Sequence, residues 1–303
     1  MNSQSGALRV STGGFRRGAP FARMLDAWRA AGDGWIPVVM GVLNVTPDSF
    51  SDGGLFEDHA TAVVHGHALV AAGAGIIDIG GESTRPGATP VSAKDEIARI
   101  VPVIEGLSGA EALLSVDTVK ASVAEAALAA GAHIVNDITG LRSDPDMARV
   151  VADVGAGLVL MHNPGFLGSS AGTKGDPVAA CLEFFAAQLD LARGAGVLAD
   201  RIVLDPGFGF GKDLEQSLEL LARLPELAVL GYPLLVGTSR KSFIGRLLGR
   251  ETHERLAGTL ATHVAAALGG AAIIRAHDVV EHVDAMRMIG AIRARTPHGR
   301  RGA

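Results

Sequence analysis

The sequence predicts an α/β fold in a single domain, a (β/α)8 barrel of the TIM type. Eight short apolar runs each end on a polar residue that is followed by Gly, Pro or a helix-capping residue, and Ile202 to Leu204 before Asp205 is the clearest example. Segments with helical periodicity separate these runs. Apolar strands that alternate with helices in this way are typical of a parallel sheet closed into a barrel.

The composition favours the same fold. Of the 303 residues, 48% are hydrophobic, 40 are Gly and only 4% are aromatic, which suits buried aliphatic strands under Ala-rich helices. The length exceeds that of a usual barrel by about one extension. We expect an N-terminal extension at residues 1–35 that caps the barrel floor, a catalytic barrel at residues 36–292 and a disordered tail at residues 293–303.

The charge pattern argues against several classes of partner. The formal net charge is −5 without an acidic or basic block, so neither nucleic acid nor a membrane is expected as a partner. No apolar run approaches the length of a membrane span, and we expect a cytoplasmic protein. The single cysteine, Cys181, excludes an intrachain disulfide and is expected to pack on an apolar helix face.

The first two strands lead into long polar loops. The run from Pro37 to Leu43 delivers Asn44 into a loop with Asp48, Ser49 and Asp52, which could bind a hard cation or could cap turns. The second strand, Ile76 to Ile79, ends at the loop GGESTRPGATP. Its arginine precedes a proline and therefore lies in extended backbone, where it could contact an anion or remain solvated.

The next strands end on acceptor groups. One ends at Asp117, the next at Asn136 and Asp137, and the sixth at Asp205. Only one residue of the Asn136 and Asp137 pair can point into the barrel mouth, and strand alternation does not decide which. Phe208 and Phe210 lie between glycines after Asp205, so we expect both rings to stack on a flat ligand rather than to join the core.

The last two strands end on cations. Ser239, Arg240, Lys241 and Ser242 follow the seventh strand at the start of a helix, and Arg275 and His277 end the eighth. Phosphate groups often bind at this position of such barrels. Carboxylates on one side of the rim and cations on the other predict a ligand with a planar, N–H-rich head and an anionic tail.

A series of motifs then resembles one enzyme family. The strings MGVLNVTPDSFSDGG, IIDIGGESTRPGA, SVDT, IVNDITG, LDPGFGFGK, GTSRKSFIG and IRAHDV resemble, in this order, the motifs of the dihydropteroate synthases. The resemblance implies a transferase that joins (7,8-dihydropterin-6-yl)methyl diphosphate to 4-aminobenzoate with loss of diphosphate, uses Mg²⁺, forms a homodimer and is inhibited by sulfonamides.

The resemblance also implies roles for individual residues. Asn44 would contact the metal, and Asp117, Lys241 and Arg275 would be catalytic. It favours Asn136 over Asp137. The residues implied for pterin diphosphate are Thr84, Asp117, Asn136, Asp205, Lys241, Arg275 and His277, and those implied for 4-aminobenzoate are Thr84, Arg85, Pro86, Phe210, Lys241 and Ser242.

Two other interpretations are compatible with a pterin pocket. A methyltransferase-type barrel that binds a folate shares the acceptor half of the pocket, but it has no need of the cations in SRKSF and RAH. A non-catalytic pterin-binding paralogue is expected to have lost loop or cation residues, and the sequence retains them.

Overall fold

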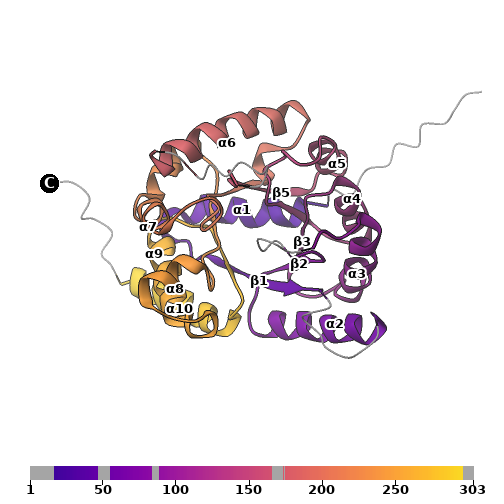
Figure 1. The fold of residues 1–303 in the computed structure, drawn as a ribbon, viewed down its shortest axis with the longest axis horizontal. Coiled ribbons are helices and arrows are strands. Elements are labelled where there is room, and N and C mark those ends of the chain that lie inside the picture. Colours follow the sequence, from indigo (N-terminus) through magenta and orange to yellow (C-terminus); the bar gives the residue numbers. More distant parts are fainter. Residues whose placement is uncertain (1–16, 47–54, 84–88, 166–172, 174, 296–303) are drawn as a thin grey trace, which may run out of the picture.

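The computed structural model describes residues 17–46, 55–83, 89–165, 173 and 175–295, with the backbone alone at residues 55–58, and it confirms the predicted barrel. Within these residues, eight parallel strands form one sheet in the order β6-β5-β4-β3-β2-β1-β8-β7. A single parallel bridge between Leu204 and Leu234 joins β6 to β7. Figure 1 shows the helices arranged around the strands.

The strands are short, as expected for a barrel. They are β1 (Val38–Asn44), β2 (Ile76–Gly80), β3 (Leu113–Asp117), β4 (Ile134–Asp137), β5 (Gly157–Met161), β6 (Ile202–Asp205), β7 (Leu235–Val236) and β8 (Ile273–Ala276). The α-helices are α1 (Ala19–Ala31), α2 (Leu55–Ala71), α3 (Ala93–Gly106), α4 (Ala121–Ala130), α5 (Met147–Val154), α6 (Pro177–Gly194), α7 (Leu214–Ala222), α8 (Ser242–Leu248), α9 (Leu256–Leu268) and α10 (Val279–Arg293).

Some predicted strand boundaries differ from the observed ones. The first strand begins one residue later than predicted and includes Asn44, and the second ends at Gly80, one residue after the predicted Ile79. Ser92 caps the start of α3, because its side chain accepts a hydrogen bond from the Asp95 N–H at 3.1 Å. A side-chain cap satisfies a backbone donor that the helix leaves free, and so it marks a boundary in the sequence more clearly than periodicity does.

Helix α1 closes the amino-terminal end of the barrel. Phe21 and Leu25 are fully buried and pack on the first residues of the strands, among them Ile76, Ile134 and Ile273. The helix passes so close to β5 that a Cβ at Gly157 would lie 2.4 Å from the Phe21 ring. Burial of each of these side chains contributes about 1.5–3 kcal/mol.

The larger hydrophobic core lies between the sheet and the outer helices. It includes Ile100 of α3, Val151 of α5 and Phe185 of α6. Cys181 is buried on the inner face of α6, as predicted from its apolar surroundings in the sequence. Among the described helices, none has the length and hydropathy needed to cross a bilayer.

Candidate active site at the carboxyl ends of the strands

The carboxyl ends of β2, β3 and β4 bring polar side chains to one level of the barrel. Gly80 pairs with Asp117, and Asp117 pairs with Asn136. Asn136 donates from Nδ2 to Asp78 Oδ2 at 2.9 Å inside the barrel. Asp137 instead accepts hydrogen bonds from the backbone N–H groups of Thr139 and Leu141, each at 2.8 Å. Asn136 therefore belongs to the rim, whereas Asp137 holds the loop that follows β4.

Arg275 joins this cluster from β8. Its Nε donates to Asp78 Oδ2 at 2.7 Å, and its Nη2 donates to Asp117 Oδ2 at 2.8 Å. Asp78 has an exposure of 0%, and it was not identified as a site residue from the sequence. The carboxylate within the apolar run IIDIG could have indicated Asp78, since a buried charge requires a partner.

Several buried acceptors in the cluster have no hydrogen-bond partner among the described residues. They are Asp78 Oδ1, Asp117 Oδ1, Asn136 Oδ1 and the hydroxyl of Ser115 on β3. A buried acceptor without a donor costs about 1–3 kcal/mol. Such a group of acceptors is suited to a flat ligand that carries several N–H donors.

The charges in the cluster shift one another's ionisation. Burial raises the pKa of Asp117 to about 7 although Arg275 opposes the shift, and the neighbouring Asp78 and Glu96 raise it further. Burial alone would lower the pKa of Arg275, but Asp78 and Asp117 hold it above its ordinary value. Arg275 therefore stays charged at any physiological pH, while Asp117 can exchange a proton near neutrality.

Asp205, Lys241 and Phe210 form a second part of the rim. Asp205 Oδ1 accepts from the Gly207 N–H at 2.7 Å, and burial raises the pKa of this carboxyl group. Lys241 Nζ lies 3.9 Å from the centroid of the Phe210 ring, a cation–π contact. The chain passes Lys241 closely at Gly209, whose φ of 76° favours glycine.

The two phenylalanines after β6 behave differently. Phe210 is partly exposed beside Lys241. Phe208 is only 1% exposed and belongs to the main hydrophobic core, so the prediction that it stacks on a ligand is wrong. Gly207, directly before this buried ring, has a φ of 70°, a backbone conformation that favours glycine.

Lys212 holds this loop in place and was not identified from the sequence. It is 8% exposed, and its Nζ donates to the carbonyl oxygens of His162, Gly207 and Phe210 at 3.2, 3.0 and 3.3 Å. Three carbonyls around one ammonium group tie the loop after β6 to the loop after β5. Asn163, next to His162, is buried, and its backbone carbonyl accepts a hydrogen bond from Arg142.

The residues after β7 and β8 divide into different roles. Ser239 Oγ lies 2.9 Å from His277 Nδ1, and burial lowers the pKa of His277 to about 4. Arg240 pairs with Asp278 instead of turning to the rim. Ser242 is exposed at the start of α8. The four residues predicted as one phosphate-binding group therefore have different contacts in the structure.

Asn44 is exposed at the end of β1. A Cβ built at Gly80 would lie 3.8 Å from Asn44 Oδ1 and 3.6 Å from Asp117 Cβ, so the Asn44 amide faces the rim across this glycine. No group of three or more His, Cys, Asp or Glu side chains that could bind a metal occurs in the described residues. Asp48, Ser49 and Asp52, the other ligand candidates in this loop, lie outside them.

Thr84, Arg85 and Pro86 also lie outside the described residues, but both flanks of their loop are described. Glu82 accepts from the Val91 N–H at 3.0 Å, and Lys120 Nζ lies 2.5 Å from both Glu82 Oε2 and Glu96 Oε2. The ends of the loop are thereby drawn together at the rim.

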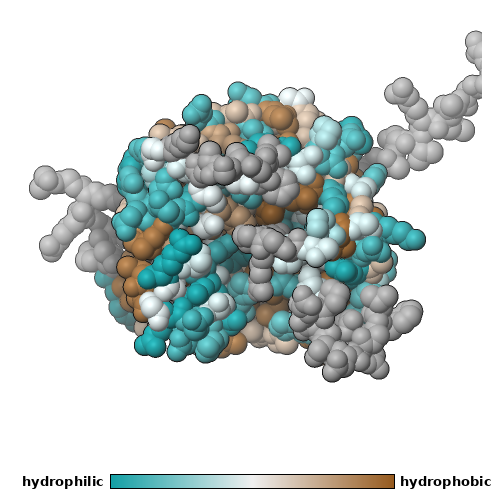
Figure 2. Space-filling model, in the orientation of Figure 1, coloured by the Kyte–Doolittle hydropathy of each residue, from teal (hydrophilic) through white to brown (hydrophobic). Residues whose placement is uncertain are grey.

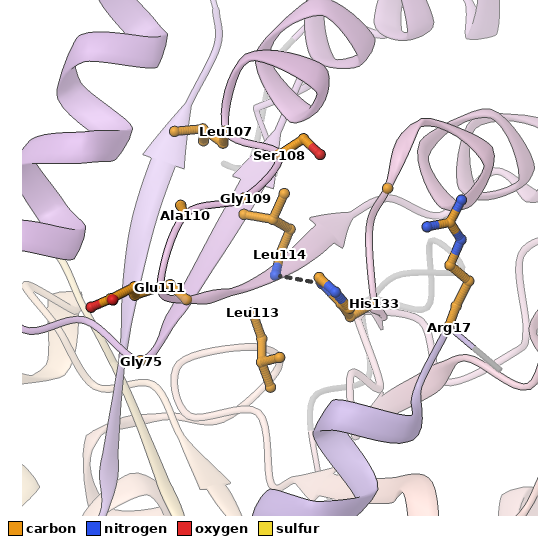
Figure 3. A pocket seen from close by; sticks show the side chains of 12 residues that line it. Arg17, Gly75, Leu107, Ser108, Gly109, Ala110, Glu111, Leu113, Leu114 and His133 are labelled. Atoms are coloured by element: carbon orange, nitrogen blue, oxygen red, sulfur yellow. Dashed lines mark hydrogen bonds between the residues drawn. The ribbon is translucent and has the colours of Figure 1, made fainter. Parts of the chain in front are cut away.

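A separate pocket of about 400 Å³ lies near the amino-terminal ends of β3 and β4 (Figure 3). The Leu114 N–H donates to His133 Nδ1 at 3.1 Å there, and Arg17 donates to the Ala129 carbonyl at 3.2 Å. Because barrel enzymes carry their catalytic groups at the carboxyl ends of the strands, this pocket is not the candidate active site.

Comparisons with known proteins agree with the geometry of the rim. A family model described as "Pterin binding enzyme" matches residues 40–277. The chain belongs to the pterin-binding enzyme family. A dihydropteroate synthase of a Synechocystis species is 50% identical over 246 residues, which cover 80% of this chain and 85% of the relative.

Solved structures of the family show the same fold. The Xanthomonas albilineans dihydropteroate synthase with 4-aminobenzoic acid has a TM-score of 0.81 and 47% identity, and the match covers 86% of this chain and 94% of that one. The Yersinia pestis enzyme in a sulfonamide drug complex has a TM-score of 0.79 and 45% identity, with 85% and 94% covered. Within the pterin-binding family, the chain is therefore a member of the dihydropteroate synthases, which are transferases, and not a methyltransferase-type barrel.

Proposed function

We propose that this chain joins (7,8-dihydropterin-6-yl)methyl diphosphate to 4-aminobenzoate and releases diphosphate. The observation that carries the proposal is the group of buried, unpartnered acceptors beside Arg275 on a single rim. The acceptors suit the N–H groups of a pterin, and a nearby cation suits the departing diphosphate.

Each part of the rim has a proposed ligand. The resemblance and the geometry together support Asp117, Asn136, Asp205 and Lys241 as pterin contacts. Asp117 and Asn136 carry unpartnered acceptors, and Lys241 lies close enough to Asp117 and Asp205 to interact with their charges. Arg275 and His277 would bind the diphosphate. Phe210, Lys241 and Ser242 would contact 4-aminobenzoate, together with Thr84, Arg85 and Pro86 from the loop after β2.

The chemistry follows from where charge develops. As the C–O bond to diphosphate breaks, Arg275 stabilises the charge that the leaving group gains, and Asp117 stabilises the positive charge that spreads from the methylene into the pterin. The aminobenzoate nitrogen then forms the new C–N bond and loses its proton to solvent. This amine is weakly basic and largely unprotonated, so the attack needs no strong general base.

A magnesium ion is compatible with the rim. Mg²⁺ keeps several waters and takes one or two oxygen ligands from the protein beside substrate phosphates, and the Asn44 amide oxygen supplies such a ligand next to Asp117. We propose that Asn44 holds Mg²⁺ together with the diphosphate of the substrate. When bound, the ion would neutralise charge on the leaving group.

The reaction itself is the direct test. Purified protein with both substrates and Mg²⁺ is expected to release one diphosphate for each dihydropteroate formed, and neither product should form when one substrate is omitted. Pterin binding without diphosphate release would instead identify a non-catalytic paralogue. Methyl transfer from a methylated folate would contradict the proposal.

Replacing Asp205 by Asn is expected to weaken pterin binding. The ligand loses a charged acceptor for its N–H groups, which costs about 1.5–3 kcal/mol, or roughly tenfold to a hundredfold in Kd. Calorimetry with a pterin that lacks the diphosphate measures the effect, and Asp200→Asn on the exposed surface is the matched control. Unchanged pterin affinity would exclude Asp205 from the pocket.

The activity is expected to depend on pH in a bell shape. Burial raises the pKa of Asp117 to about 7 and lowers that of Lys241 to about 8. As the pH rises through about 7, kcat/KM for the pterin substrate should increase because Asp117 becomes an ionised acceptor. It should fall above about 8 as Lys241 loses its charge.

Variants assign the two limbs of this profile. Asp117→Asn should remove the acidic limb, and Lys241→Arg should move the alkaline limb to higher pH. A flat wild-type profile between about pH 6 and about pH 9 would contradict the assignment.

Sulfonamides are expected to inhibit the enzyme by competing with 4-aminobenzoate, as the resemblance implies. KM for 4-aminobenzoate should rise with sulfamethoxazole concentration while kcat stays constant. Turnover that is unaffected by saturating sulfamethoxazole would refute this prediction.

We also propose a homodimer and a cytoplasmic location. The outer helices α8, α9 and α10 carry exposed apolar side chains that contact between two copies would cover: Leu247, Leu248, Leu268, Val280, Met288 and Ile292. Figure 2 shows hydrophobic surface on the side where Figure 1 places α7 and α9. Light scattering would test the dimer, and cell fractionation would test the location.

A further inference from the structure

Two buried histidines lie behind the loops that follow β7 and β8. His263 of α9 and His282 of α10 each have an exposure of 0%. Their rings meet edge to face, with centroids 4.8 Å apart and an angle of 68° between the planes. Neither residue is among the proposed substrate contacts, yet two buried imidazoles require hydrogen-bond partners.

The backbone around them determines which ring nitrogen carries a proton. The Thr238 N–H donates to His263 Nε2 at 3.1 Å, so the proton of this neutral ring is on Nδ1. His282 Nδ1 lies 2.5 Å from the Asp278 carbonyl oxygen. A carbonyl can only accept, so His282 Nδ1 is protonated and its Nε2 is an acceptor.

The two remaining ring nitrogens complement each other. His263 Nδ1, a donor, and His282 Nε2, an acceptor, have no other partner among the described residues. Burial lowers the pKa of both histidines, which keeps the two rings neutral. One free donor and one free acceptor on neighbouring rings are complementary partners for a hydrogen bond.

We propose that His263 and His282 are positioning residues that form a neutral relay from the Thr238 N–H, through both rings, to the Asp278 carbonyl. The relay fixes the loops after β7 and β8 relative to each other and thereby sets the diphosphate-binding geometry of Ser239, Arg275 and His277. The role of these three groups rests on the proposed function, whereas the relay itself does not.

The sheet contact between β7 and β8 is short, so their loops need a further link, which the relay supplies. These strands pair only at Leu235 with Ile273 and at Val236 with Ile274. Beyond them, Ser239 Oγ contacts His277 Nδ1 at 2.9 Å and accepts from the His277 N–H at 3.2 Å. Thr238 and Asp278, the two ends of the relay, adjoin these residues in the chain, so the relay continues the link where the sheet has ended.

Nuclear magnetic resonance of the unmodified protein tests the relay without any ligand. With ¹⁵N-labelled histidine, both rings are expected to be neutral Nδ1–H tautomers, although free neutral imidazole side chains favour Nε2–H. An Nε2–H tautomer at either His263 or His282 would overturn the proposal. The result is independent of turnover, so it also separates failure of the relay from failure of the proposed function.

Two variants test the positioning role. His263→Gln places an amide oxygen near the former Nε2, and His282→Asn places an amide N–H near the former Nδ1, so each preserves an outer bond and breaks the central one. Each is expected to raise the Kd of inorganic diphosphate with Mg²⁺ about fivefold to tenfold, which corresponds to one hydrogen bond. The Kd of 6-hydroxymethylpterin should change less than about twofold, because three of the four proposed pterin contacts, Asp117, Asn136 and Asp205, come from β3, β4 and β6.

The double variant and a control complete the test. Combining both substitutions should be no worse than the more severe single one, because both break the same central bond. His65→Gln, on the exposed face of α2, should change neither Kd. Equal weakening of both ligands, additive losses or unchanged diphosphate binding would each overturn the positioning role.

Discussion

Replacing Arg275 by Ala is expected to lower kcat by about a hundredfold to a thousandfold, the loss seen when one preorganised charge-stabilising group is removed from an active site. Arg275 is the cation at the centre of the rim and contacts both Asp78 and Asp117. Without it, two carboxylates would face the leaving group and repel its developing negative charge. The loss in kcat should be larger at low Mg²⁺ concentration. Without Arg275, neutralisation of the leaving group depends on the bound ion.

The variant should also lose stability, because removing one partner of a buried ion pair costs about 3–5 kcal/mol. The measured rates must therefore be divided by the concentration of folded protein. Arg293→Ala is the matched control, since it removes an arginine that donates to the carbonyls of Trp35 and Ala267, remote from the rim. It should lower Tm and leave kcat of the folded protein intact. A loss in Arg275→Ala that is confined to KM for 4-aminobenzoate would contradict the role of this arginine.

Replacing Lys212 by Met is expected to be strongly destabilising. The substitution leaves the carbonyls of His162, Gly207 and Phe210 without their shared donor. At about 1–3 kcal/mol for each unsatisfied carbonyl, the free energy of unfolding should fall by about 3 kcal/mol or more. Because Phe210 lies on the released loop, KM for 4-aminobenzoate should rise.

Urea unfolding and steady-state kinetics measure the two effects of Lys212→Met. Lys94→Met, on the exposed face of α3, removes the same charge without breaking a contact to this loop and should change neither quantity. An unfolding midpoint equal to that of the wild type would show that water or a rearranged loop satisfies these carbonyls, and that Lys212 does not hold the loop.

The fold could be predicted because its main signal is local. Apolar runs such as Ile202 to Leu204 are too short for helices and end in turn residues, and this run is observed within β6. Helix boundaries are harder to place, because hydrophobic periodicity does not locate the first and last residues of a helix.

The site could be predicted in part. Strand ends are visible in a sequence, so Asp117, Asn136 and Asp205 were candidates from their positions alone. Which contacts each side chain makes depends on residues that are distant in the sequence, so it cannot be read from the strand ends alone. Asp78 is a rim residue because Arg275, 197 positions later, donates to it, and Phe208 is buried in a core built from residues that are distant in the sequence.

A crystal structure with (7,8-dihydropterin-6-yl)methyl diphosphate tests the central claim most directly. Pterin N–H groups are expected against Asp117, Asn136 and Asp205, with the diphosphate beside Arg275 and His277, in one cavity at the carboxyl ends of the strands. A pterin ring bound away from these acceptors, or a diphosphate held in a different cavity from the ring, would contradict it.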